Sequence, residues 1–65
     1  MSSVPPSTRD VVIAEDSPPL AALYARALRE AGFTVREFRS ATACLGAIAQ
    51  QPPAVAVIDL GLRDM

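Results

Sequence analysis

Three short apolar segments alternate with two longer amphipathic segments along the chain. The apolar segments are residues 9–14, 33–38 and 55–59, and their length and β-branched residues are typical of strands. Between them, residues 18–31 and 41–50 repeat apolar side chains at helical spacing. The pattern therefore predicts the order strand, helix, strand, helix, strand, with the second strand less buried than the first.

The first helix is expected to begin at Pro18. Ser17 can cap it, and proline suits the first helical position because no amide donor is needed there. Gly32 stands where a glycine commonly ends a helix. The apolar residues of this helix fall on one stripe, which we expect to face the core: Leu20, Leu23, Tyr24, Ala27, Leu28 and Ala31.

The second helix is expected to span Ala41 to Gln50, with Ser40 as its cap and Gln51-Pro52-Pro53 after its end. Its inward positions are predicted to be Ala41, Cys44, Leu45 and Ile48. On this inward face, Cys44 is expected to be a packed core thiol and not a reactive one.

Alternating strands and helices of this kind predict an α/β fold with a parallel sheet. We expect three parallel strands in the order 2-1-3, with the first strand in the centre. Crossovers between parallel strands are right-handed. In the order 2-1-3 the chain first moves to one side of the central strand and then reverses to the other side. The two helices should therefore lie on opposite faces of the sheet.

Composition narrows the function classes. A chain of 65 residues forms at most one small domain, which buries only about 60% of its unfolded surface. Disorder is not expected, because 51% of the residues are hydrophobic and 20% are charged. The net charge of −1 offers no electrostatic basis for binding nucleic acid or an anionic membrane. No apolar segment approaches the roughly 18 residues that a membrane span requires.

Residues 1–8 are rich in Ser and Pro and are predicted to form a flexible tail. They lack the basic start and apolar core of a signal peptide, so a cytoplasmic location is expected. The chain has no histidine and no lysine, and its six basic residues are all arginine, which we expect on solvated faces. Nucleophilic sites that pair Ser or Cys with His are therefore excluded, and no glycine-rich nucleotide loop is present.

Acidic residues follow the first and third predicted strands. Glu15 and Asp16 come directly after the first strand, and Asp59 ends the third. Neighbouring parallel strands bring these ends to one edge of the sheet, where ligands bind. Asp16 and Asp59 can ligate Mg²⁺ directly, Glu15 through water, and Gly61 through its backbone carbonyl. The alternative is that Asp16 caps the first helix and Asp59 is a solvated loop residue.

The segments 11–17 (VVIAEDS) and 57–65 (VIDLGLRDM) together resemble the receiver domain of two-component response regulators. The resemblance covers residues 9–65, and the 43-residue gap between Asp16 and Asp59 is typical of the family. It implies a partial flavodoxin-like fold and a phosphoacceptor, Asp59, that takes a phosphoryl group from a histidine kinase or phosphotransfer protein. Magnesium would be held by Asp16, Asp59 and the carbonyl of Gly61.

The chain also departs from the family pattern. Receivers have five strands, and the fourth and fifth carry a Ser or Thr and a Lys that respond to the phosphoryl group. Residues 9–65 are therefore expected to be the N-terminal portion of an incomplete receiver, without its switch and output parts. Arg63 stands in place of the usual proline, which would loosen the loop or bring a guanidinium near the site.

Two other functions stay open at this point. The chain could be an interaction module that binds a kinase or a receiver without being phosphorylated, or a metal-dependent phosphotransferase; we do not expect an enzyme. The third strand, residues 54–59, would lack a neighbour on one side in this chain. We therefore expect poor folding or self-association through that edge.

Overall fold

The computed structural model describes residues 8–59 and 61–64. The tail predicted over residues 1–8 therefore lies outside the described residues, except for Thr8. All five predicted elements are present, in the predicted order: β1 (Asp10–Ala14), α1 (Pro18–Glu30), β2 (Thr34–Phe38), α2 (Ala41–Gln50) and β3 (Val55–Ile58). No helix in the described ranges is long and apolar enough to cross a membrane.

The three strands form one parallel sheet in the order β2-β1-β3, as predicted. Val12 in the middle of β1 lies opposite Arg36 of β2 on one side and Ala56 of β3 on the other. Every residue of β1 is buried, whereas β3 is mostly exposed. The central strand therefore supplies the largest part of the core.

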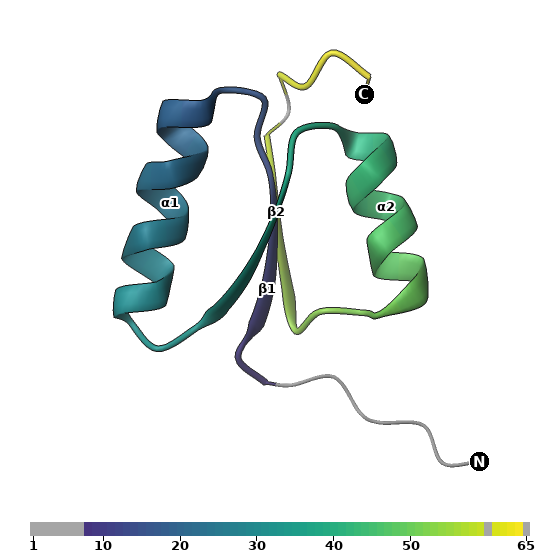
Figure 1. Cartoon of the computed structure of the whole chain (residues 1–65). Coiled ribbons are helices and arrows are strands. Elements are labelled where there is room, and N and C mark those ends of the chain that lie inside the picture. The colour runs from purple at the N-terminus through teal and green to yellow at the C-terminus, as the bar shows by residue number, and fades with distance from the viewer. Residues whose placement is uncertain (1–7, 60, 65) are drawn as a thin grey trace, which may run out of the picture.

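The helices cover opposite faces of the sheet, which confirms the prediction from strand order (Figure 1). Successive side chains of β1 point to opposite faces, so the two faces have separate cores. On the α1 face, Val11 and Ile13 cluster with Ala25 and Val35. On the α2 face, the cluster contains Val12, Ala14, Ala41, Cys44 and Leu62.

The predicted helix boundaries are confirmed by the capping contacts. The Ser17 hydroxyl accepts the N–H of Leu20 at 3.5 Å, and Pro18 is the first residue of α1. The Ser40 hydroxyl accepts the N–H of Ala43 at 3.1 Å. Gly32 has a φ of +96°, which residues other than glycine rarely adopt. The chain turns there into β2.

The predicted inward face of α1 is wrong in part. Ala21 and Ala25 are the buried residues of the helix, whereas Leu23 is 60% exposed. Of the predicted stripe, only Leu28 packs against the core; Leu20, Tyr24, Ala27 and Ala31 are exposed. Small side chains allow the helix axis to approach the sheet closely, so the alanine face packs and the larger residues lie on the flank.

The predicted inward face of α2 needs one correction. Ala41 and Cys44 are buried and Ile48 packs against them, as predicted, but Leu45 is exposed. Cys44 is a fully buried free thiol, which confirms its place in the core. Burial raises the pKa of the Cys44 thiol, while the nearby Arg36 guanidinium acts in the opposite direction.

One arginine, Arg36, is half-buried and does not lie on a fully solvated face. The Arg36 guanidinium contacts both carboxylate oxygens of Asp10, at 3.3 and 2.7 Å, and its Nη2 also donates to the carbonyl of Gln51 at 2.8 Å. The Asp10 side chain is only 7% exposed and that of Arg36 24%. This pair joins β1, β2 and the end of α2, and it corrects the expectation for Arg36.

Removing one partner of this pair is expected to destabilise the fold. Arg36→Met keeps an apolar stem but leaves the Asp10 carboxylate buried without its cation. Because breaking a buried pair leaves an uncompensated charge, we expect the free energy of unfolding to fall by about 2 kcal/mol. Urea unfolding followed by circular dichroism measures the change.

The matched control is Arg26→Met, which breaks the exposed Arg26–Glu30 pair of α1. Exposed pairs of this kind contribute about 0–1 kcal/mol. Equal losses of stability in the two variants would contradict the role assigned to the Asp10–Arg36 pair.

The outer edge of β3 is apolar and exposed. Among the described residues β3 pairs only with β1, and its Val55 and Val57 are 51% and 42% exposed. Edge strands are commonly protected by charged side chains; β2 carries Arg36 and Glu37, whereas β3 carries none. We therefore expect copies of this chain to associate through β3.

Val55→Lys places a cation on this edge and is expected to convert associated chains to monomers. Light scattering at low micromolar concentration measures the change in mass. Thr34→Lys adds the same charge to β2, at the opposite edge, and serves as the control. Association that survives equally in both variants would argue against β3 as the contact.

Candidate metal centre

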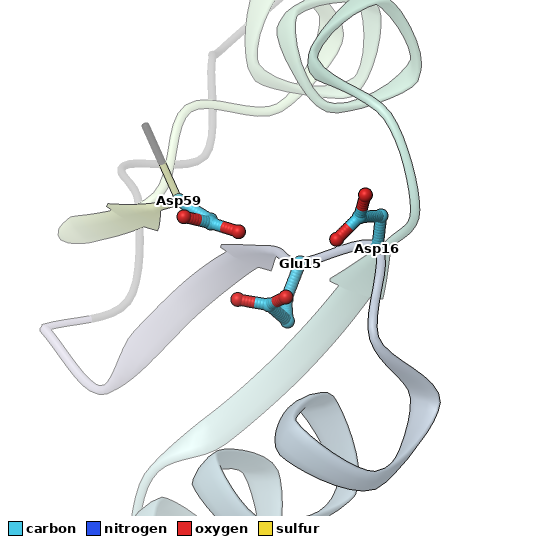
Figure 2. Close-up of side chains that lie close together, drawn as sticks. All are labelled: Glu15, Asp16 and Asp59. Carbon is cyan, nitrogen blue, oxygen red and sulfur yellow. The ribbon is translucent and has the colours of Figure 1, made fainter. Parts of the chain in front are cut away.

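Three carboxylates meet at one edge of the sheet. One oxygen from each of Glu15, Asp16 and Asp59 lies within 4.8 Å of the others, and Figure 2 shows the three side chains turned toward a common space. Glu15 and Asp16 follow β1 and Asp59 follows β3, so the predicted convergence of these acids is confirmed. Carboxylate oxygens are ligands for hard divalent cations, and this cluster can hold a metal ion.

The parallel hydrogen bonding of the sheet continues for one residue beyond the strands and places two of these acids, Glu15 and Asp59. The Asp59 N–H donates to the carbonyl of Ala14 at 3.0 Å, and the Glu15 N–H donates to the carbonyl of Phe38 at the same distance. Both acidic residues are thus held at the backbone by a neighbouring strand. Their separation follows from the register that pairs Ala14 with Ile58.

The two acids after β1 have different environments. Glu15 is buried, and its Oε1 accepts the N–H of Ser17 at 3.1 Å, whereas Asp16 is exposed. Ser17 is the cap of α1, so the alternative in which Asp16 caps that helix is wrong. Asp16 contributes its carboxylate to the cluster instead.

Asp59 is half-buried and is oriented by the loop that follows it. Its Oδ1 accepts the N–H of Gly61 at 2.9 Å. A Cβ at position 61 would lie 3.4 Å from that oxygen and 3.6 Å from Oδ2, which are ordinary van der Waals distances. The Gly61 backbone therefore lies at the site, while the ligand role of its carbonyl stays a prediction.

An open depression lies beside Asp59, between α1 and β3. Its volume is about 370 Å³. It is lined by Ile13, Ala14, Glu15, Tyr24, Val57, Ile58 and Asp59. Tyr24, which we expected to pack in the core, is one wall of this depression. The depression gives a second molecule access to the Asp59 carboxylate across a partly apolar surface.

Two residues near the site were not predicted from the sequence. Asp64 accepts the N–H groups of Ala41 and Thr42, both at 2.8 Å, at the start of α2. Arg39 Nη1 donates to the carbonyl of Glu15 at 3.5 Å. Asp64 stands in segment 57–65, which carries the resemblance, but neither contact has a local signal because each joins residues more than twenty positions apart.

The hydrogen bonds to Asp64 change its titration. The N–H of Thr42, followed by that of Ala41, lowers the pKa of the Asp64 carboxyl from 3.8 to about 2. Beside it, Arg63 is exposed, and the loop on either side is anchored by buried Leu62 and by Asp64. Leu60 and Met65 of the predicted motif lie outside the described residues.

No protein-family model matches the chain, and no curated protein or solved structure is significantly similar to it. The resemblance to receiver domains consequently rests on the motif residues. The order and pairing of the five elements are consistent with part of a flavodoxin-like fold.

The lowered pKa of Asp64 predicts a pH-dependent contribution to stability. A carboxyl whose pKa is depressed on folding stabilises the fold above its ordinary pKa of 3.8, and this contribution is lost as the pH falls through about 2. We expect wild type to exceed Asp64→Asn in its urea midpoint at neutral pH, and the gap to close as the pH falls from about 4 to about 2. A gap that stays constant over this range would contradict the prediction.

Proposed function

We propose that the chain is a phosphoacceptor module of a phosphorelay, in which Asp59 accepts a phosphoryl group from a histidine kinase or phosphotransfer protein in a magnesium-dependent reaction. The observation that carries the proposal is the convergence of Glu15, Asp16 and Asp59, with ligand oxygens within 4.8 Å of one another. Their positions, after two adjacent parallel strands, agree with the pattern that the sequence resembles.

Magnesium suits this arrangement because it takes oxygen ligands and retains several waters. Asp16 is exposed and Asp59 half-buried, so both can ligate directly. Glu15 already accepts the Ser17 N–H, and its remaining oxygen is suited to a water ligand. The carbonyl of Gly61 would complete the protein ligands. The cation would also offset the repulsion among three nearby carboxylates.

The transfer balances without another cofactor. A carboxylate oxygen of Asp59 attacks phosphorus, the N–P bond of the donor phosphohistidine breaks, and the leaving imidazole takes a proton from water. The product is an acyl phosphate on Asp59. Magnesium held by Asp16 and Asp59 would supply positive charge against the phosphoryl oxygens, and the Gly61 N–H fixes one oxygen of the Asp59 carboxylate.

The depression beside Asp59 supports the same reaction. Ile13, Tyr24 and Val57 provide apolar walls next to the carboxylate. A histidine ring can lie against such walls while its phosphoryl group faces the metal and Asp59. The 65 residues contain no histidine, so the donor histidine must lie outside them.

The proposal predicts magnesium-dependent labelling of Asp59 by acetyl phosphate or by a phosphorylated histidine kinase. Intact-mass spectrometry should show one added phosphoryl group that is lost in alkali, as expected of an acyl phosphate. Asp59→Asn should abolish the label, and Asp16→Asn should lower its rate by about 10–100-fold through weaker metal binding. Glu30→Gln, on the exposed end of α1, is the control and should label like wild type.

Labelling that persists in excess EDTA, or that moves to another residue, would contradict the proposal. The interaction-module alternative predicts a different result: a kinase would bind wild type and Asp59→Asn equally, and neither would gain a phosphoryl group.

A further inference from the structure

The start of α2 is capped by Asp64, which stands more than twenty positions later in the chain. Ala41 and Thr42 donate their N–H groups to the two carboxylate oxygens of Asp64, and Ala43 donates to the Ser40 hydroxyl. The first intrahelical bond of α2 then runs from Cys44 to the Ser40 carbonyl. The first three amides of the helix, which have no partner within it, are thus all satisfied.

Asp64 supplies a charge that α2 does not have in its own sequence. The first turn of α2 contains no acidic residue, although a helix N-terminus favours a negative charge. In Figure 1 the segment after β3 passes over this end of α2. The cap therefore also holds the loop that follows the candidate metal centre.

Residues 61–64 connect this cap to Asp59. Leu62 is buried against Val12, Ala14 and α2, and the Leu62 N–H reaches the Asp59 carbonyl at a long 3.3 Å. Gly61 lies between Asp59 and Leu62 and donates to Asp59 Oδ1. The direction of the Asp59 carboxylate thus depends on a loop with two side-chain anchors, Leu62 and Asp64.

We propose that Asp64 is a positioning residue for the acceptor site, which holds residues 61–64 on the start of α2 and thereby keeps the Gly61 N–H on Asp59. This contact sets the orientation of the Asp59 carboxylate toward Glu15 and Asp16. The consequence for phosphoryl transfer rests on the proposed function, whereas the consequences for the Gly61 amide and for metal binding do not.

Ser40→Ala provides a matched control for Asp64→Ala. Both variants remove a cap from the same end of α2, but only Asp64 belongs to the loop beside Asp59. Asp64→Asn retains an acceptor oxygen and serves as a milder variant if Asp64→Ala folds poorly. The amide resonance of Gly61, the Mg²⁺ dissociation constant from amide shifts, and the labelling rate with acetyl phosphate are measured for each full-length variant.

Asp64→Ala should shift the Gly61 resonance and weaken Mg²⁺ binding by about tenfold, the loss typical of a residue that orients a metal ligand. Asp64→Asn should show a smaller loss, and Ser40→Ala should leave both quantities at wild-type values. A Gly61 resonance that does not move in Asp64→Ala, or that moves equally in Ser40→Ala, would overturn the inference.

The readouts separate this inference from the proposed function. If wild type is not labelled at Asp59, but the Gly61 resonance responds to Asp64→Ala and not to Ser40→Ala, the phosphoacceptor role fails and the positioning role stands. If Asp64→Ala is labelled at the wild-type rate and its Gly61 resonance is unchanged, the positioning role fails while the phosphoacceptor role stands.

Discussion

The pairing of β1 with a parallel strand on each side is the constraint on which the other features depend. Each residue of β1 is buried, and its side chains alternate between two cores, one beneath each helix. Burial of the backbone polar groups of such a strand is tolerated only when both edges are hydrogen-bonded. The register with β2 and β3 therefore fixes the positions of both cores and of the strand ends.

The candidate metal centre follows directly from this register. Parallel strands place their carboxyl ends at one edge, and each helix begins at that same edge because it follows a strand. The positive ends of the α1 and α2 dipoles thus lie on the side of the sheet where the acids gather. Glu15 accepts the N–H of Ser17, the cap of α1, and Asp64 accepts the first two N–H groups of α2. The acidic edge is consequently linked to both helices.

The face of α1 that packs on the sheet is not the face that carries its largest apolar residues. Ala21 and Ala25 pack on the sheet, which leaves Tyr24 beside Val57 at the depression and Leu23 exposed. Apolar surface is thereby distributed around the Asp59 carboxylate and along β3. The same surface that gives the depression its apolar walls also accounts for the expected association of the chain.

The sequence by itself determined the elements, their order, the parallel sheet and the convergence of Glu15, Asp16 and Asp59. These features follow from local periodicity, from caps such as Ser17 and Ser40, and from rules that relate strand order to crossovers. Only the tertiary structure decided which face of α1 packs, the Asp10–Arg36 pair, and the contact of Asp64 with α2. The rotation of a helix about its axis depends on how closely it approaches the sheet. Contacts between residues more than twenty positions apart leave no periodic signal in the chain.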